Sequence, residues 1–186
     1  MNAKATSRTT QVRNFFLGAA LALAAHESGH LAFDFAFDAQ PRLKGVSFVG
    51  IPFFALTHRP DLSPRREYLI SSAGFNVQHA INEWILTARP RLRHTAAPLT
   101  KGVLAFNVAA SVAYGSVALG RGGPYERDTR GMADGVGLDE PWIGVAVLAP
   151  AVLDGLHYVR PESRWARWAS RGAKVTVVLL VLRRRP

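Results

Sequence analysis

Residues 14–37 read NFFLGAALALAAHESGHLAFDFAF, a stretch of 24 residues that holds no lysine or arginine. As an α-helix this stretch would be about 36 Å long, which is enough to cross the hydrocarbon core of a membrane. Its acidic residues are Glu27 and Asp34, and a third, Asp38, follows just past its end. We therefore expect a first helix that spans a membrane and carries ionisable side chains along its length.

Three further apolar stretches lie downstream of the first. Val103–Leu119 contains no charged residue, and Trp142–Val159 contains Asp154 as its one formal charge. Tyr68–Leu86 is more polar, but it is of similar length. Together with the first stretch they predict a mainly α fold, a polytopic membrane helical bundle of about four spans.

A short segment between the first two stretches has a different character. Gly45–Phe54 is rich in β-branched and aromatic residues and is punctuated by glycine and proline. This pattern predicts a short strand or hairpin after the first helix, at the edge of the membrane.

The composition sets limits on the class of protein. The chain has 186 residues, a size typical of one domain, and a formal net charge of +10. Hydrophobic residues make up 48% of it and the mean hydropathy is +0.06, which excludes a disordered basic tail. Because the chain has no cysteine, it forms no disulfide, zinc ribbon or catalytic thiol.

The positive charge is distributed in an alternating pattern. Basic residues precede residue 14, fill Arg89–Lys101 and follow Val159, whereas the loop Arg121–Glu140 holds three arginines against five acids. By the positive-inside rule, this predicts an integral protein of the plasma or inner membrane with cytoplasmic N- and C-termini. The five basic residues of Asp38–Arg66, on the expected outer side, depart from that pattern.

The chain is expected to have two parts. Residues 1–160 would form the membrane-embedded domain, and residues 161–186 would form a basic amphipathic segment at the interface, anchored by Trp165 and Trp168. We therefore assign the positive charge to contact with membrane lipid and expect no nucleic-acid partner, since no nucleic-acid-binding signature is present.

The start of the chain allows a second interpretation. Basic Met1–Arg13 and apolar Phe15–Leu23, followed by small residues at Ala22-Leu23-Ala24, also fit a secretory signal peptide cleaved near residue 24. The apolar stretch continues through Phe37, which a signal peptide does not require, so an uncleaved span is favoured.

The chemistry is predicted to lie in the first helix. His26-Glu27-Ser28-Gly29-His30 is an H-E-x-x-H pattern, in which residues i and i+4 share one helical face and can bind one metal ion. Glu27 could act as general base on a water molecule that the metal activates. The alternative is a polar cluster that only packs against a neighbouring helix.

Two histidines need a third protein ligand, and two regions offer one. Asp154 is the only carboxylate inside Trp142–Val159, although it could instead pair with Arg160 at the interface. His79 and Glu83 share one face of the predicted second helix with Asn76, and either could complete the site. The remaining histidines, His58, His94 and His157, are interpreted as loop or interfacial residues.

Four segments carry a family resemblance. His26-Glu27-Ser28-Gly29-His30, the Gly/Pro-rich β segment, Ala73-Gly74-Phe75-Asn76 and Leu153-Asp154-Gly155 occur in an order that resembles the site-2 protease family of intramembrane zinc metalloproteases. The resemblance covers roughly residues 14–160. It implies that His26, His30 and Asp154 bind Zn²⁺, that Glu27 is catalytic, and that the substrate is a membrane-associated polypeptide.

Three functional hypotheses follow. The first is a zinc-dependent intramembrane endopeptidase. The second is a membrane protein without peptidase activity, which keeps a metal site and binds a partner; it is favoured by Pro150, one residue later than the family's proline, and by the missing upstream asparagine. The third is a compact helical zinc enzyme that uses Glu83.

Overall fold

The computed structural model describes residues 7–48 and 50–183. Its elements, in chain order, are α1 (Arg8–Ala36), β1 (Arg42–Phe48), β2 (Ile51–Thr57), α2 (Pro64–Ala88), η1 (Leu92–His94), α3 (Pro98–Leu119), α4 (Asp128–Val136), α5 (Glu140–Val159), α6 (Arg164–Leu179) and η2 (Leu180–Leu182). The expected mainly α fold with a short β segment after the first helix is confirmed. Of the basic residues that flank the apolar stretches, Lys4 and the last two arginines lie outside the described part of the chain.

Helix α1 begins where the sequence offers a capping residue. The Ser7 hydroxyl accepts a hydrogen bond from the Thr10 backbone N–H at 3.2 Å, which satisfies one free donor of the first turn. The helix then continues without interruption through the H-E-x-x-H residues to Ala36, as their long apolar context predicts.

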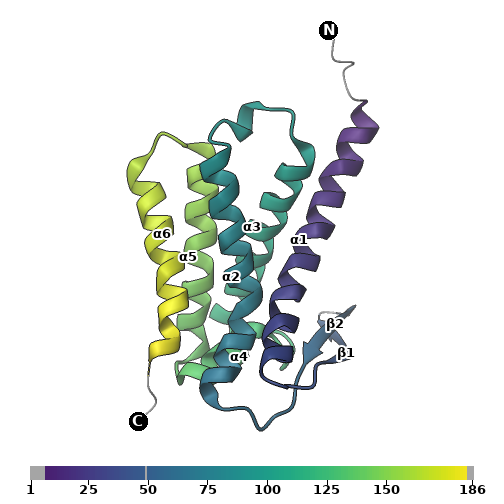
Figure 1. Ribbon diagram of the computed structural model, residues 1–186, viewed down its shortest axis with the longest axis vertical. Helices are drawn as coiled ribbons and strands as arrows, with labels where there is room; N and C mark the ends of the chain where they lie inside the picture. The colour runs from purple at the N-terminus through teal and green to yellow at the C-terminus, as the bar shows by residue number, and fades with distance from the viewer. Residues whose placement is uncertain (1–6, 49, 184–186) are drawn as a thin grey trace.

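The β segment is a two-stranded antiparallel hairpin. Strands β1 and β2 pair in register from Arg42 opposite Thr57 to Phe48 opposite Ile51. Gly50 lies in the turn with a φ of +78°, a backbone conformation that glycine adopts without strain. The hairpin extends away from the helices, beside the end of α1 (Figure 1).

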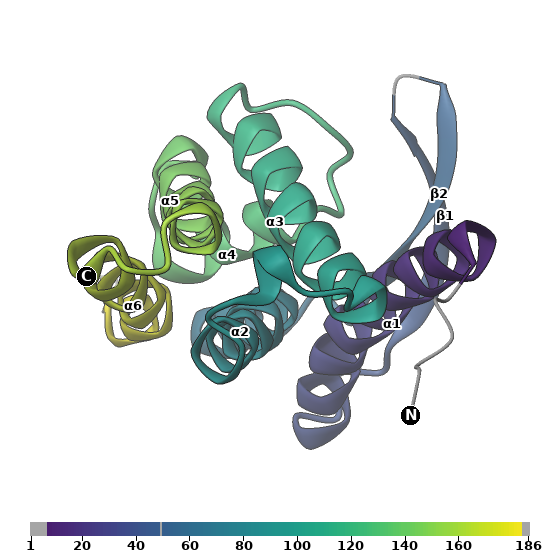
Figure 2. The same cartoon turned by 90° about the horizontal axis from the view of Figure 1, so that it is seen from above.

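The five long helices lie side by side (Figure 1). Seen from above, α2 lies between α1 and α6, and α3 and α5 form a second row behind it (Figure 2). The main contacts are those of α1 with α3 and α2, of α3 with α5, and of α5 with α6. The short helix α4 packs under α2, at the same end of the bundle as the hairpin.

Glycines allow neighbouring helices to approach closely. A Cβ atom on Gly18 of α1 would lie 2.1 Å from the Leu99 carbonyl oxygen, and one on Gly102 of α3 would lie 1.9 Å from the Phe15 carbonyl oxygen. Gly115 of α3 and Gly144 of α5 meet in the same way. Backbone contact at small residues is the packing mode typical of membrane helices.

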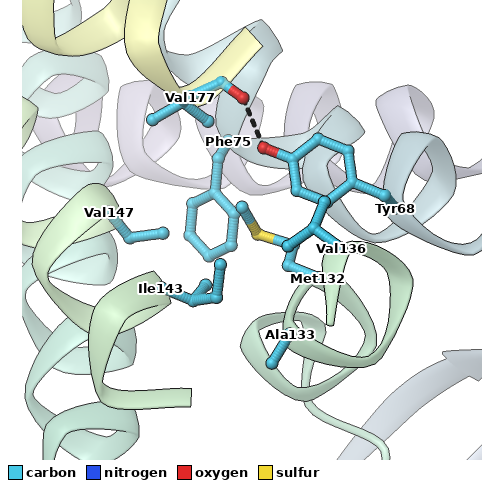
Figure 3. Packing of buried hydrophobic residues seen from close by; sticks show 8 residues of the cluster. All are labelled: Tyr68, Phe75, Met132, Ala133, Val136, Ile143, Val147 and Val177. Carbon is cyan, nitrogen blue, oxygen red and sulfur yellow. Dashed lines mark hydrogen bonds between the residues drawn. The ribbon is translucent and has the colours of Figure 1, made fainter. Parts of the chain in front are cut away.

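Two apolar clusters lie at opposite ends of the bundle, and polar side chains fill the space between them. The larger cluster joins α2, α4, α5 and α6, and its members are Tyr68, Phe75, Met132, Ala133, Val136, Ile143, Val147 and Val177. Within it, the Tyr68 hydroxyl donates a hydrogen bond to the Val177 carbonyl (Figure 3). The smaller one contains Ile85, Leu86, Leu92 and Leu104.

Two helices of the described chain, α3 and α5, are long and apolar enough to cross a membrane. The other two predicted spans, α1 and α2, form long helices but carry ionisable and amide side chains near their middles, which lower their hydropathy. The four-span arrangement therefore remains a prediction.

The C-terminal segment, predicted to lie at the membrane interface, contains a helix that packs within the bundle. Helix α6 packs along α5 and α2 as part of the bundle, so the chain passes along the bundle five times in the described residues. The start of α1 and the end of α6 consequently lie at opposite ends (Figure 1), whereas four spans would place both termini on one side.

Candidate metal centre

The two histidines of the H-E-x-x-H pattern lie on the buried face of α1. That face is a stripe of small and polar residues with helical spacing: Gly18, Ala22, His26, Gly29, His30 and Asp34. The Nε2 atoms of His26 and His30 are 3.1 Å apart, as expected for imidazoles one turn apart that point to a common centre. The shared face predicted from the spacing is therefore present.

Helix α2 approaches this face through Ala73 and Gly74. A Cβ atom on Gly29 would lie 2.9 Å from the Ala73 carbonyl oxygen, so the two helices are in backbone contact. A Cβ atom on Gly74 would lie 2.5 Å from Nε2 of His26 and 2.6 Å from Nε2 of His30. The space beside the two nitrogens exists only because residue 74 has no side chain.

The tautomer of His30 is set by a backbone carbonyl. Nδ1 of His30 lies 2.8 Å from the Ile70 carbonyl oxygen, which can only accept a hydrogen bond. Nδ1 therefore carries a proton, so that the neutral form of the ring presents its lone pair at Nε2, as metal-binding histidines require. His26 is held by its neighbours, with its ring edge-on to Phe75 at a centroid distance of 5.4 Å.

A carboxylate from a distant part of the chain completes the group. Oδ2 of Asp128 lies 3.2 Å from Nε2 of His26 and 3.4 Å from Nε2 of His30. His26, His30 and Asp128 form a group that could hold a metal ion, with all ligand atoms within 4.8 Å of one another. A four-coordinate ion with bonds of about 2.0–2.2 Å separates adjacent ligand atoms by roughly 3.3–3.6 Å, close to these three distances.

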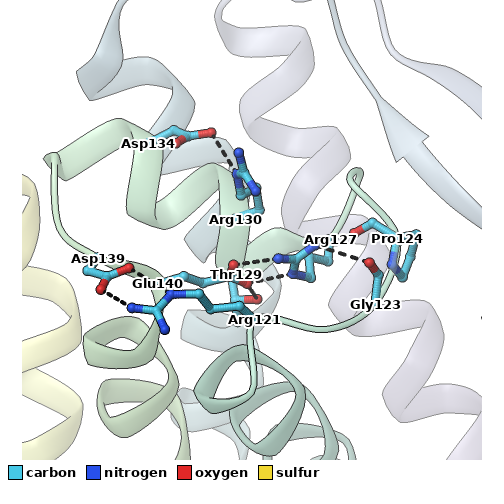
Figure 4. A network of polar contacts seen from close by, with 9 residues as sticks. All are labelled: Arg121, Gly123, Pro124, Arg127, Thr129, Arg130, Asp134, Asp139 and Glu140. Atoms are coloured by element: carbon cyan, nitrogen blue, oxygen red, sulfur yellow. Dashed lines mark hydrogen bonds and ion pairs between the residues drawn. The ribbon is translucent and has the colours of Figure 1, made fainter.

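Asp128 is the first residue of α4, and a network of polar contacts fixes its position (Figure 4). Arg127 forms a buried ion pair with Glu140 at the start of α5, and its Nη1 donates to the Pro124 carbonyl at 2.6 Å. Thr129 donates to Glu140 at 3.0 Å. Because both sequence neighbours of Asp128 are tied to Glu140, its carboxylate is held against α1.

The charge state of Asp128 follows from its surroundings. Burial alone would raise the pKa of Asp128, but the charges and hydrogen bonds of His30 and His26 outweigh burial and hold this pKa well below its usual range. The carboxylate is therefore ionised at neutral pH, which is the form that binds a metal.

Two cavities meet at this group. The first, the Glu27 cavity, has a volume of about 340 Å³ and is lined by Glu27, His30, Asp128 and Tyr114, with Phe48, Phe53 and Phe54 of the hairpin forming an aromatic wall. The second, the Asp34 cavity, has a volume of about 540 Å³ and shares His30 and Asp128 with the first; Asp34, His58 and Glu67 also line it. Glu27 thus opens onto space next to the candidate ligands.

Asp154, the expected third ligand, lies in a different cluster. Its carboxylate is fully buried and accepts hydrogen bonds from Asn82 at 3.0 Å and Ser170 at 2.6 Å, and Lys174 Nζ lies 2.7 Å from it. The carboxylate beside the two histidines is that of Asp128 instead. The physical reason is that α6 packs within the bundle and supplies the countercharge that an isolated Asp154 would lack.

The two alternative ligands on α2 are also outside the group. Glu83 accepts hydrogen bonds from Arg171 at 2.8 Å and Lys174 at 3.2 Å, so it belongs to the Asp154 cluster. His79 is buried on α2, and its Nε2 has no hydrogen-bond partner among the described residues. Neither forms part of the His26–His30–Asp128 group.

The contribution of Asp128 was not identified from the sequence, where it counts among the five acids of an outer loop. A signal was present in the two glycines that follow it. A Cβ atom on Gly131 would lie 2.1 Å from Ser71 Oγ, and one on Gly135 would lie 2.6 Å from the Tyr68 nitrogen. Glycines spaced four residues apart mark a short helix packed closely against another helix.

No protein-family model, curated protein or solved structure matches this chain.

Proposed function

We propose that the protein is a zinc-dependent hydrolase that cleaves a membrane-associated polypeptide. The observation that carries the proposal is the triangle formed by Nε2 of His26, Nε2 of His30 and Oδ2 of Asp128, with sides of 3.1, 3.2 and 3.4 Å. Two neutral imidazoles and one carboxylate are a donor set typical of catalytic zinc. The proposal thus keeps the histidines implied by the family resemblance and assigns the third ligand to Asp128.

Within the proposed centre, zinc would supply Lewis acidity that polarises a scissile carbonyl and lowers the pKa of water. The chain's own residues supply the proton transfers. The Glu27 carboxylate follows a ligand directly and lines the adjoining cavity, so it can take a proton from water at one of its oxygens and pass it to the leaving amine nitrogen. The Ile70 carbonyl keeps His30 oriented throughout.

The Glu27 cavity supports an extended peptide as substrate. Its aromatic wall comes from the hairpin, and β2 pairs on one edge only within the described residues, with β1. An unpaired strand edge offers N–H and C=O groups to a peptide backbone, and the neighbouring apolar side chains offer contacts to its residues.

A membrane location is supported by the distribution of polar and apolar side chains. Large apolar residues are exposed on the outer faces of the helices, including Phe16 and Leu21 on α1, Val152 on α5 and Val178 on α6, while histidine, asparagine and aspartate are buried between the helices. Polar side chains within a membrane protein face the interior of the bundle, which is the arrangement seen here.

The test is metal analysis of the purified protein in detergent together with peptide cleavage. We expect one zinc per chain in the parent protein and in Asp139→Asn, which removes an exposed carboxylate between α4 and α5, and at least a tenfold loss of zinc affinity in Asp128→Asn. Glu27→Gln is expected to retain zinc but to lose cleavage of an unstructured peptide library, with products followed by mass spectrometry. Equal cleavage by the parent and Glu27→Gln, or loss of zinc in Asp154→Asn but not in Asp128→Asn, would refute the proposal.

A further inference from the structure

The Asp34 cavity contains a carboxylate that the metal centre does not use. Asp34 lies one turn beyond His30 on the buried face of α1, and only 1% of its surface is exposed. Neither of its carboxylate oxygens accepts a hydrogen bond from the part of the chain that the structure describes. A buried carboxylate without hydrogen bonds lowers the free energy of unfolding, so a functional partner is expected.

The nearest positive group only partly compensates this charge. Nδ1 of His58 lies 3.5 Å from Asp34 Oδ1, while its Nε2 lies 2.8 Å from Glu67 Oε2. Burial lowers the pKa of His58, but the hydrogen bond and charge of Glu67 and the charge of Asp34 outweigh burial and raise it above its usual range. His58 is therefore shared between Asp34 and Glu67 and cannot serve as the full partner of both carboxyl groups.

The other charged groups lining the cavity already have partners. Lys44 pairs with Glu126 at 2.5 Å and Arg130 pairs with Asp134 at 3.5 Å. The remaining lining cation, Arg127, forms the buried pair with Glu140. Among the described residues Asp34 therefore has no cationic partner of its own, and it lines a cavity with room for a further cationic group.

We propose that the Asp34 cavity binds the positively charged group of a basic residue, an ammonium or a guanidinium, with Asp34 as its main carboxylate partner and Glu67 as the second. That the basic residue belongs to the cleaved polypeptide rests on the proposed function. Because the two cavities meet at His30 and Asp128, a bound chain would place an apolar residue in the Glu27 cavity and a basic residue in the Asp34 cavity.

A divalent cation, which also prefers oxygen ligands, is the competing occupant that the experiment must distinguish. The two occupants can be distinguished because a metal in the Asp34 cavity raises the number of zinc ions bound per chain, whereas a basic side chain does not. Zinc content measured after reloading a chelated sample distinguishes them. We expect one zinc per chain in both the parent and Asp34→Asn.

The binding experiment uses N-acetyl-arginine methylamide as probe and the citrulline analogue as its neutral isostere, with isothermal titration of the zinc-loaded protein in detergent. We expect the parent to bind the arginine probe at least tenfold more tightly than the citrulline probe. Asp34→Asn should abolish this preference and Glu67→Gln should reduce it. Glu162→Gln removes an exposed acid from the loop before α6 and should leave it unchanged.

Several results would overturn the proposal: equal binding of the two probes by the parent, an unchanged preference in either Asp34→Asn or Glu67→Gln, or two zinc ions in the parent and one in Asp34→Asn. Asp34→Asn is expected to unfold at a temperature no lower than the parent, because it removes a buried charge. The second variant keeps the test decisive if the first does not fold. A retained probe preference in a protein that cleaves no peptide would refute the proposed hydrolase activity and leave the cation site standing.

Discussion

Oδ2 of Asp128 lies 3.2 Å from Nε2 of His26, although 102 positions separate the two residues in the sequence. The contact requires α4 to fold back beneath α2, and α4 is held there by the pairing of Arg127 with Glu140. The candidate metal centre is thus a product of tertiary packing as much as of the H-E-x-x-H pattern. The centre therefore depends on the packing of α2 and α4 against α1.

Gly74→Ala should remove metal binding without unfolding the bundle. The added methyl group would lie 2.5–2.6 Å from the Nε2 atoms of both histidines, a distance at which the imidazoles must move out of alignment. We expect at least a tenfold loss of zinc affinity by competition with a chelator. Gly155→Ala is the matched control, because its Cβ atom would meet nothing within 4 Å, and as a helical Gly→Ala change it should stabilise the protein by up to about 1 kcal/mol. Normal zinc affinity in Gly74→Ala would contradict the geometry described above.

Glu140→Ala should weaken both the fold and the metal site. It leaves the Arg127 guanidinium buried without its carboxylate, a change that costs about 3–5 kcal/mol of unfolding free energy, and it releases the first turn of α4 that carries Asp128. The adjacent Asp139→Ala removes an exposed ion pair with Arg121 and should alter neither property measurably. Denaturant unfolding in detergent and zinc titration give the two readouts. Similar results for the two variants would show that the contacts of Glu140 with Arg127 and Thr129 do not position Asp128.

The part of the site that depends on local spacing could be predicted from the sequence. The i, i+4 spacing placed His26 and His30 on one face, and the glycine and proline of residues 45–54 indicated the hairpin. The third ligand depends on contacts between distant residues. Asp154 stood out because it interrupts an apolar helix, but the structure gives it Lys174 as countercharge.

One further expectation failed for the same reason. His157, interpreted from the sequence as a loop or interfacial residue, is buried with only 2% of its surface exposed. Its burial depends on how α5 is rotated within the bundle, and the apolar composition of α5 on all sides gives no indication of that rotation.

The interaction of His58 with two carboxylates predicts a pH dependence of stability. Because the folded protein raises the pKa of His58 above its ordinary value of 6.5, this group binds its proton more tightly in the folded state than in the unfolded state. Its stabilising contribution is complete below about pH 6 and declines as the pH rises from 6.5 through the folded pKa. The gap in unfolding temperature between the parent and His58→Gln should therefore narrow from pH 6 to pH 9. His94→Gln, at an exposed position, should follow the parent throughout, and a gap for His58→Gln that widens with pH would contradict the assignment.

Lys174→Met separates the structural role of the Asp154 cluster from the metal centre. Lys174 Nζ lies 2.7 Å from Asp154 and 3.2 Å from Glu83, and it is almost fully buried. Its removal leaves Asp154 with hydrogen bonds from Asn82 and Ser170 but with no countercharge, so the free energy of unfolding should fall by about 3–5 kcal/mol.

The control for this variant is Lys44→Met, which breaks a pair whose lysine is 57% exposed and should cost at most about 1 kcal/mol. Chemical unfolding in detergent measures both variants, and zinc analysis is done on the folded fraction. Zinc binding should survive in Lys174→Met, because Lys174 pairs with Asp154 and Glu83 and with none of the three candidate ligands. A folded Lys174→Met protein that binds no zinc would contradict the separation of the Asp154 cluster from the metal centre.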